Sequence, residues 1–175
     1  MKITKNWKDL DKSLYTWDEN TRTFSSSEDW LVLDFSDMDW VTFDTGYDCT
    51  FNTGYKCTFK TGSDCTFNTG YDCTFNTGYD CTFNTDSGCT FNTGYDCTFK
   101  TGFRCTFNTG YDCTFKTGSN CVIVRRDLFE VIILDWTNKI KLNWYKIKGY
   151  TIIEDSKKVT VELTKEQLEK IKHLI

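Results

Sequence analysis

The stretch Cys65-Thr66-Phe67-Asn68-Thr69-Gly70-Tyr71-Asp72 is one copy of an eight-residue phrase that repeats without a gap over residues 41–120. Phenylalanine occupies the third position of every copy, and threonine occupies the fifth. Cysteine marks the first position from Cys49 to Cys121, always eight residues from the next. Periodicity of this kind indicates a repeat architecture, so the fold is inferred from the repeat before any other feature.

The fourth position of the repeat shows which side of the chain faces water. It holds aspartate, asparagine or lysine, as at Asp44, Asn68 and Lys100. Because an unpaired charge is costly to bury, this position is predicted to be exposed. Side chains alternate along a strand, so positions 1, 3 and 5 point inward and positions 2 and 4 point outward. Positions 6 to 8 then form a corner, in which the glycine at position 6 is expected to supply a positive φ.

The number of octads in one coil follows from the corner residues. One octad, with a perimeter of about 8 × 3.3 Å, is too short to close around a phenylalanine. Two octads give a flattened coil, and three give a triangular prism. At position 8, alternate copies form one all-aspartate set, namely Asp48, Asp64, Asp80, Asp96 and Asp112, and one mixed set, namely Lys56, Asp72, Gly88, Arg104 and Asn120. This separation favours two octads.

The sequence therefore predicts an all-β fold, a parallel β-solenoid with two octads (16 residues) per flattened coil. Equivalent residues would stack about 4.8 Å apart in register. The predicted core ladders of one sheet are Cys49, Cys65, Cys81, Cys97 and Cys113 with Phe51, Phe67, Phe83, Phe99 and Phe115. The outward face of that sheet would carry Thr50, Thr66, Thr82, Thr98 and Thr114. The hand of the coil stays open.

The ten cysteines are predicted to be free, buried thiols. Stacked Cβ atoms about 4.8 Å apart are farther apart than the 3.5–4.5 Å usual in a disulfide, so an oxidised ladder, the alternative, needs local distortion. Zinc fits poorly, because the spacing lacks short cysteine pairs and the only histidine is His173.

Two segments without the clean repeat are predicted to cap the solenoid. Residues 1–32 form the N-terminal cap, with a helical turn over 5–12 and a hairpin over 14–24. The solenoid covers 33–124, and its first, degenerate coil has Leu33 at position 1 and Phe35 at position 3.

Residues 125–175 are predicted to form the C-terminal cap. Degraded repeats come first, with Phe129, Val131 and Ile133 facing inward. A β-hairpin of 150–154 and 159–163 follows. The capping-box pattern of residues 164–167 then opens a helix. Its apolar residues, Leu168, Ile171, Leu174 and Ile175, fall near one face.

Charge and hydropathy limit the class of protein. The net charge of −4 divides into −4 in residues 1–40, −3 in 41–120 and +3 in 121–175, so the chain is acidic at its start and basic at its end. There is no apolar run long enough to span a membrane, and residues 1–7 contain no hydrophobic signal region. We expect a cytoplasmic or virus- or particle-associated protein without a membrane partner.

Candidate sites are few. The row of Asp48, Asp64, Asp80, Asp96 and Asp112 could bind calcium between coils, or could simply stabilise hydrated corners. The C-terminal lysines are interspersed with acids, which makes nucleic acid an unlikely partner. No nucleophile elbow, phosphate loop or other catalytic pattern occurs, so neither an enzyme nor a cofactor is expected.

The phrase resembles octapeptide-repeat parallel β-solenoid proteins over residues 33–124. Its inward cysteines and outward threonines are similar in design, though not in repeat length or motif, to insect antifreeze solenoids, and this likeness implies an ice-binding face. Here the second outward rank is asparagine, interrupted by Lys60, Lys100 and Lys116. The sequence favours a structural rod that joins itself end to end. The alternative is a surface-array protein that binds ice or another repetitive ligand through its threonine face.

Overall fold

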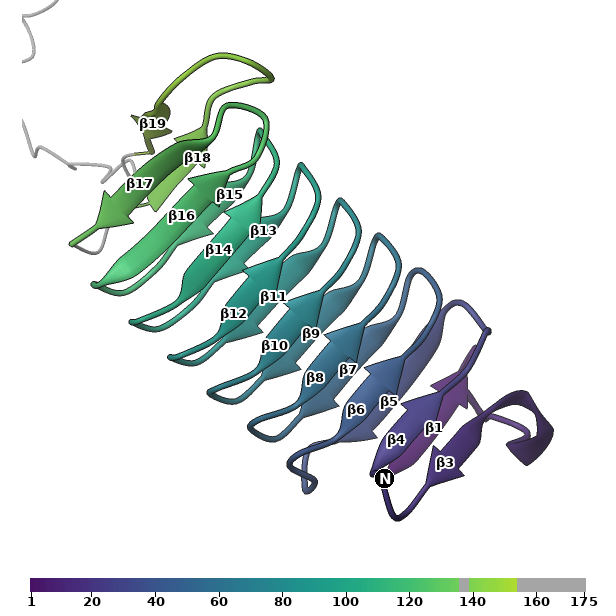
Figure 1. Ribbon diagram of the computed structural model, residues 1–175. Helices are drawn as coiled ribbons and strands as arrows, with labels where there is room; N and C mark the ends of the chain where they lie inside the picture. Colours follow the sequence, from purple (N-terminus) through teal and green to yellow (C-terminus); the bar gives the residue numbers. More distant parts are fainter. Residues whose placement is uncertain (136–138, 154–175) are drawn as a thin grey trace, which may run out of the picture.

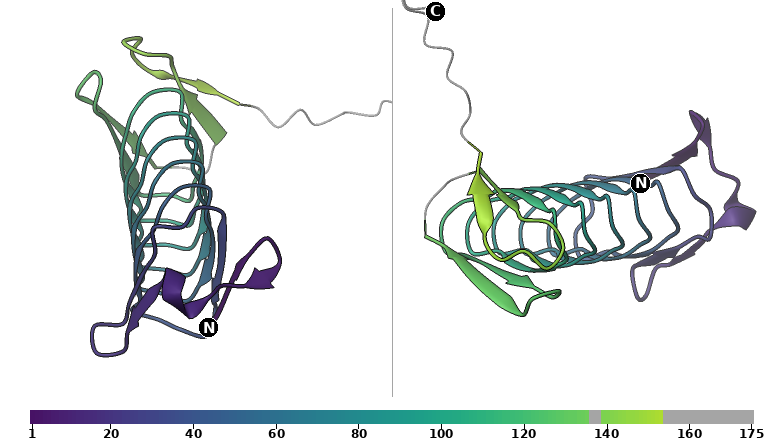
Figure 2. Two further views of the ribbon diagram at one scale, coloured as in Figure 1. Left: turned by 90° about the vertical axis from the view of Figure 1, so that its right-hand side faces the viewer. Right: turned by 90° about the horizontal axis from the view of Figure 1, so that it is seen from above.

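The computed structural model describes residues 1–135 and 139–153. These residues form a rod in which the chain winds through a stack of flattened coils, with one strand of each coil on either broad side (Figure 1). The two turned views of Figure 2 show the coils stacked as loops along the rod and the separate elements at its two ends. The predicted parallel β-solenoid is therefore confirmed.

Two sheets make up the described part of the rod. The ten-stranded sheet runs in the order β19 (Tyr150–Ile152), β18 (Lys139–Leu142), β15 (Thr114–Lys116), β13 (Thr98–Lys100), β11 (Thr82–Thr85), β9 (Thr66–Thr69), β7 (Thr50–Thr53), β5 (Leu31–Phe35), β1 (Lys2–Lys5) and β2 (Lys8–Asp9). The nine-stranded sheet runs in the order β17 (Glu130–Leu134), β16 (Cys121–Arg125), β14 (Thr106–Thr109), β12 (Thr90–Asn92), β10 (Thr74–Asn76), β8 (Thr58–Lys60), β6 (Thr42–Asp44), β4 (Thr23–Ser25) and β3 (Thr16–Asp18).

The strand register confirms the sixteen-residue coil. In the ten-stranded sheet Phe51 lies beside Phe67 and Phe67 beside Phe83, and all these strands are parallel. The same offset relates Phe59 to Phe75 in the other sheet. Every predicted ladder cysteine and phenylalanine is buried, whereas Thr50, Thr66, Thr82 and Thr98 are exposed and Thr114 is half-buried. The alternation of inward and outward positions is therefore correct.

Phenylalanine packing fills the core in two directions. Within a sheet the rings are stacked, and those of Phe51 and Phe67 have centroids 4.9 Å apart and planes 3° apart. Between sheets they meet edge to face, with Phe51 and Phe59 at 5.3 Å and 76°. Both arrangements are favourable for aromatic pairs, which contribute about 0.5–1.5 kcal/mol each beyond the burial of their area. Each mid-rod ring thus has four aromatic neighbours.

The corners use glycine differently from the sequence expectation. Positive φ angles occur at position 8, for example 54° at Asp48 and 55° at Lys56, and not at the position-6 glycines. Glycine is required at position 6 because adjacent coils approach closely there. A Cβ on Gly70 would lie 3.2 Å from the backbone of Gly54, whose carbonyl accepts a hydrogen bond from the Gly70 amide at 3.1 Å. The expectation of positive φ at position 6 was wrong, because close contact between coils, not turn conformation, selects the residue.

A Gly70→Ala substitution is expected to lower the free energy of unfolding by about 1–3 kcal/mol, because overpacking forces the backbone of adjoining coils apart. Urea denaturation followed by circular dichroism would measure it. Asp86→Ala is the matched control, because Asp86 occupies the same corner position and already carries a Cβ. Equal losses for the two variants would contradict the close-approach explanation.

The N-terminal cap contains a different first element from the one predicted. Residues 5–12 form no helical turn, because β1 and β2 pair as a hairpin around Asn6 and Trp7, which adopt φ of 52° and 65°. A short 3-10 helix, η1 (Lys12–Leu14), follows. The hairpin predicted over residues 14–24 is present as β3 and β4. Its Trp17 ring lies 5.9 Å from Phe35 and covers the first coil.

The first coil is longer than the repeat, and this shifts its frame. Leu33 pairs with Phe51 and Phe35 with Thr53, so Leu33 occupies position 3 and Phe35 position 5. The predicted frame, with Leu33 at position 1, was wrong by two residues because the corner after Phe35 contains two extra residues. Asp39 in this longer corner accepts a hydrogen bond from the Tyr55 amide at 3.0 Å and so joins it to the next coil.

The C-terminal end closes with antiparallel strands. β17 pairs with β16, and β18 pairs with β15 and β19. Because the chain reverses at Phe129, Ile132 faces inward beside Ile123, and Val131 and Ile133 are exposed. The predicted inward set of Phe129, Val131 and Ile133 was wrong for this reason. The predicted strand 159–163 and the helix from residue 164 lie outside the described residues.

Candidate functional surfaces

The outer face of the ten-stranded sheet is a regular polar lattice. Its second-position rank is Thr50, Thr66, Thr82, Thr98 and Thr114, one threonine for each coil. Its fourth-position rank is an asparagine ladder, in which Asn84 donates from Nδ2 to Asn68 Oδ1 at 2.9 Å. These hydrogen bonds pair the asparagine side-chain amides with one another. The threonine hydroxyls are therefore the regularly spaced groups that this face offers to a ligand.

The asparagine ladder gives way to lysine at the C-terminal end of the same face. Lys100 pairs with Asn84, Lys116 with Lys100, and Lys139 with Lys116. Like charges directly opposite one another in a sheet are destabilising. At the other end of the same rank stands Asp34, beside Asn52. The asymmetry of charge seen in the sequence is thus carried along one face of the rod.

The aspartate edge consists of Asp48, Asp64, Asp80, Asp96 and Asp112, which recur with positive φ at one corner of successive sixteen-residue coils. Partial burial, the hydrogen bond to Asp112 and the neighbouring negative charges raise the pKa of Asp96. Lys141 of β18 bonds to Asp112 across 2.7 Å and closes the row. In residues 1–135 and 139–153 no group of three or more His, Cys, Asp or Glu side chains is arranged to hold a metal ion. Calcium at this edge stays a prediction.

Lowering the pH from 7 toward 4 is expected to raise the melting temperature. Asp96 has a higher pKa in the folded chain than its ordinary value of 3.8, so the folded state binds this proton more tightly. The resulting stabilisation is complete below pH 3.8 and is lost as the pH rises through the folded-state pKa. Calorimetry between pH 4 and 7 would measure the shift.

Asp96→Asn should reproduce this gain at pH 7 and flatten the pH dependence. Asp72→Asn, at the opposite edge where Lys56 lies one coil away, is the matched control and should not raise the melting temperature. An Asp96→Asn variant that melts like the parent at pH 7 would contradict repulsion along the edge.

The corner tyrosines stack on one another instead of presenting open ring faces. Tyr79 and Tyr95 have centroids 5.0 Å apart and planes 2° apart, and Tyr95 stacks in turn on Tyr111. At two corners where serine replaces tyrosine, the serine Oγ accepts an amide hydrogen bond from the next coil: Ser63 from Tyr79 and Ser87 from Phe103, both at 3.1 Å. The corner aromatics therefore stabilise the edge, and those within a stack offer ring edges and hydroxyls to a ligand.

The cysteines are buried free thiols. Each Sγ lies near two corner carbonyl groups, and in Cys65 these are the carbonyl oxygens of Ser63 at 3.4 Å and Gly46 at 3.8 Å. Hydrogen bonds between successive thiols raise the pKa of Cys97 to about 12 and lower the pKa of its neighbour Cys113. A reactive thiol must also be accessible, and all ten thiols are buried, so the ladder acts as a packing element.

A buried ion cluster at the C-terminal end was missed from the sequence. Arg125 stands at an inward fifth position beside Thr109 and is completely buried. Its guanidinium donates to both carboxylate oxygens of Asp127, at 3.0 and 2.6 Å, and lies 3.8 Å from Glu130. It also donates to the carbonyl of Ile147 at 2.6 Å. This cluster holds the loop between β18 and β19 against the last coil. The sequence signal for this cluster is an arginine at the fifth position, which holds threonine in every preceding octad.

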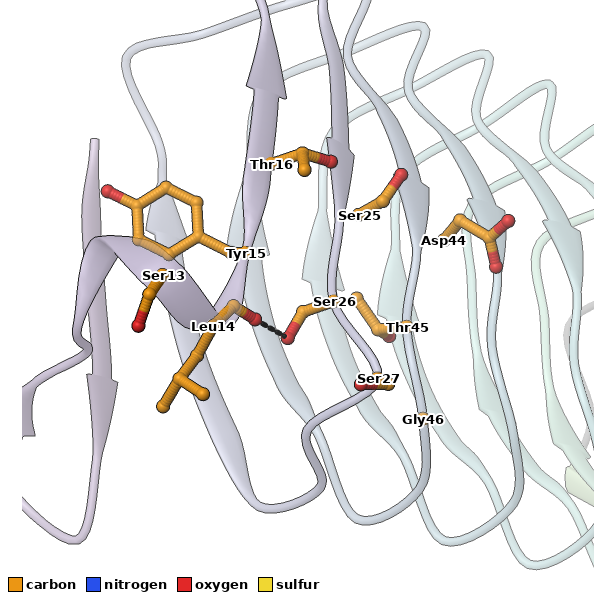
Figure 3. A pocket seen from close by; sticks show the side chains of 10 residues that line it. All are labelled: Ser13, Leu14, Tyr15, Thr16, Ser25, Ser26, Ser27, Asp44, Thr45 and Gly46. Atoms are coloured by element: carbon orange, nitrogen blue, oxygen red, sulfur yellow. Dashed lines mark hydrogen bonds between the residues drawn. The ribbon is translucent and has the colours of Figure 1, made fainter.

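A cavity of about 530 Å³ lies between the N-terminal cap and the first corner (Figure 3). Its lining residues are Ser13, Leu14, Tyr15, Thr16, Ser25, Ser26, Ser27, Asp44, Thr45 and Gly46. Ser26 Oγ donates to the Leu14 carbonyl at 2.8 Å. The buried Thr45 hydroxyl has no hydrogen-bond partner, but neither have the equivalent hydroxyls of Thr77 and Thr93 along the rod. That feature belongs to the repeat and does not mark a ligand site.

The fold and its surfaces define the chain as a sixteen-residue-coil parallel β-solenoid with two polar faces and one acidic edge. Comparisons with protein-family models, curated proteins and solved structures find no match for this chain. Over residues 1–135 and 139–153, none of the helices has the length and apolar character needed to cross a membrane.

Proposed function

We propose that the chain is a structural rod that spans a fixed distance and joins other copies end to end. The observation that carries this proposal is the unbroken register from β6 to β14, in which every coil repeats the same phenylalanine stack and backbone ladder. A rod of this kind gains its stability from contacts between neighbouring coils and lengthens by about 4.8 Å with each one. Repetition also argues against catalysis, because an active site requires dissimilar groups that converge.

The ends of the rod support the assembly part of this proposal. The first 40 residues are net negative, and residues 121–175 are net positive. β3 and β17, at the two ends of one sheet, both run opposite to the coil strands. β2 and β19, at the ends of the other sheet, both run with them. Head-to-tail contact would therefore place strands of equal direction side by side in both sheets.

Electron microscopy and light scattering over a range of protein and salt concentrations test this function. We expect rods whose length grows with protein concentration and shrinks with added salt, because salt screens attraction between the oppositely charged ends. A chain that stays monomeric at the highest concentration would exclude assembly. A compact particle in small-angle scattering would exclude the rod itself.

A second candidate function is the binding of ice or another repetitive ligand. It is favoured by the outward threonine rank of the ten-stranded sheet, which offers one hydroxyl per coil on a regular lattice. Thermal hysteresis and altered ice-crystal shape, both lost in a Thr66→Lys/Thr82→Lys variant, would support it. A parent protein without hysteresis would exclude ice as the ligand.

For either function we propose a cytoplasmic or particle-associated location and no cofactor.

A further inference from the structure

Three lysines stand in one row on the outer face of the ten-stranded sheet. Lys100 lies directly opposite Lys116, and Lys116 lies directly opposite Lys139, on the neighbouring strands β13, β15 and β18. Adjacent strands are about 4.8 Å apart, so the three positive charges repel one another. We call these three residues the lysine row. The asparagine that the repeat places at this position in β7, β9 and β11 would avoid the repulsion.

The other sheet shows how a lysine at this position is balanced within the chain. Lys60 lies opposite Asp44, and its Nζ is 3.5 Å from Asp44 Oδ2. In the described part of the chain, no acidic side chain forms an ion pair with the lysine row. Lys100 and Lys116 are exposed, and Lys139 is half-buried. A sequence usually departs from the pattern of its own fold at a functional or strained site, so the lysine row is a candidate contact for an anionic partner.

The aspartate edge has the complementary charge and the same period. It supplies one carboxylate for each coil, so its charges also recur about every 4.8 Å. Desolvation and the negative charges of Asp64 and Asp29 raise the pKa of Asp48, and Asp64 and Asp80 are exposed. Because the two rows share one spacing, a lysine row can lie along an aspartate edge with each ammonium next to a carboxylate.

One contact within the chain shows that a corner of this edge accepts a lysine. Lys141 of β18 lies with its Nζ 2.7 Å from Asp112 Oδ1, at the last corner of the edge. The hydrogen bond to Asp112 raises the pKa of Lys141. Over the residues that the structure describes, the other four aspartates of the edge form no ion pair. These four carboxylates are therefore open to ammonium groups from outside the chain.

We propose that the lysine row binds the aspartate edge of a second copy of this chain, so that rods associate side by side. A single exposed ion pair contributes little, but a network of such pairs contributes more. Here the contact would also relieve the repulsion within both rows. The contact uses the long sides of the rod, so it goes beyond the proposed end-to-end joining and does not depend on it. Where rods do lengthen end to end, the ion pairs of successive copies would reinforce one another.

Two charge-reversal variants test the proposal in the full chain. Lys100→Glu/Lys116→Glu reverses the lysine row, and Asp64→Lys/Asp80→Lys reverses the middle of the aspartate edge. Each variant alone should lose side-by-side association, because its two rows carry charges of the same sign. An equimolar mixture of the two variants should recover it, because the introduced glutamates of one variant meet the introduced lysines of the other.

Small-angle scattering from concentrated protein measures the cross-section of the rods. At about 0.01 M salt, where the screening length is about 30 Å, we expect the parent to have at least a doubled cross-sectional mass. Each variant alone should give the single-rod value, and so should the parent at about 1 M salt, where the screening length is about 3 Å. End-to-end joining changes the length of the rods and leaves their cross-section unchanged, so the two kinds of assembly are measured separately.

Lys56→Glu/Arg104→Glu is the matched control, because it changes the net charge by the same amount at the opposite edge. It should associate like the parent. Lys100→Asn/Lys116→Asn, which restores the usual residue of the repeat, should also weaken association and is the gentler change should a reversal variant fail to fold.

Two results would overturn the proposal. One is a parent that keeps the single-rod cross-section at every concentration at low salt, and binding of inorganic polyphosphate by such rods would assign the lysine row to a polyanion instead. The other is a mixture of folded reversal variants that does not recover the cross-section of the parent.

Discussion

Replacing Phe83 by alanine is expected to lower the free energy of unfolding by about 3–5 kcal/mol, the usual range for truncating a buried phenylalanine. Phe83 is completely buried in the middle of the rod. Its ring stacks on Phe67 and Phe99, each at 4.9 Å, and meets Phe75 and Phe91 edge to face. All four pairs are lost in the variant, so the effect should lie at the upper end of the range.

The adjacent residue supplies the control for this measurement. Asn84 is exposed, and its side chain contributes one hydrogen bond to Asn68. Asn84→Ala should therefore change the free energy of unfolding by about 1 kcal/mol or less. Urea denaturation of both variants would give the comparison. Phe83→Leu provides a milder change should the alanine variant fail to fold. A Phe83→Ala loss no larger than that of Asn84→Ala would contradict a core built on the phenylalanine stack.

The solenoid could be predicted because each of the ten octads in residues 41–120 shows the same pattern of positions. The tolerance of position 4 for Asp44, Asn68 and Lys100 alone shows which side faces water, and strand alternation then fixes the other positions. The aspartates in alternate copies of position 8 indicated the length of the coil. Each inference rests on a regularity of the backbone that no single substitution can reverse.

The predictions were wrong at the ends of the repeat and at residues whose environment is set by a neighbouring strand or coil. Leu33 is sixteen residues before Cys49, but the longer corner after Phe35 moves it beside Phe51. Val131 and Ile133 continue the alternation in sequence, but reversal of the chain at Phe129 turns them outward. Position-6 glycine is explained only by the neighbouring coil. In each case the deciding contact is with a strand whose register the local sequence does not specify.

Replacing Arg125 by threonine is expected to lower the free energy of unfolding by about 3–5 kcal/mol, although threonine is the usual residue of the repeat at this position. Removing one partner of a buried ion pair leaves the other charge without compensation. Here Asp127 and Glu130 would lose their guanidinium, and the carbonyls of Trp144 and Ile147 would lose a donor. The loop that these carbonyls belong to should then exchange its amide hydrogens faster.

Variation of pH and two further variants separate this charge effect from lost packing. Burial alone would raise the pKa of Asp127, but the bond to Arg125 and the Lys146 amide outweigh it, and the folded-state pKa lies below 3.8. The contribution of Asp127 is therefore present above pH 3.8 and is lost as the pH falls through the folded-state value, so the loss caused by Arg125→Thr should shrink in acid. Arg126→Thr removes hydrogen bonds to Asn92 and to the Thr93 carbonyl but leaves no buried charge unpaired, so it should cost less than Arg125→Thr. Arg125→Thr/Asp127→Asn should recover part of the loss, because one uncompensated carboxylate is gone. Arg125→Thr as stable as the parent, or Arg125→Thr/Asp127→Asn less stable than Arg125→Thr, would show that this cluster does not stabilise the C-terminal end of the rod.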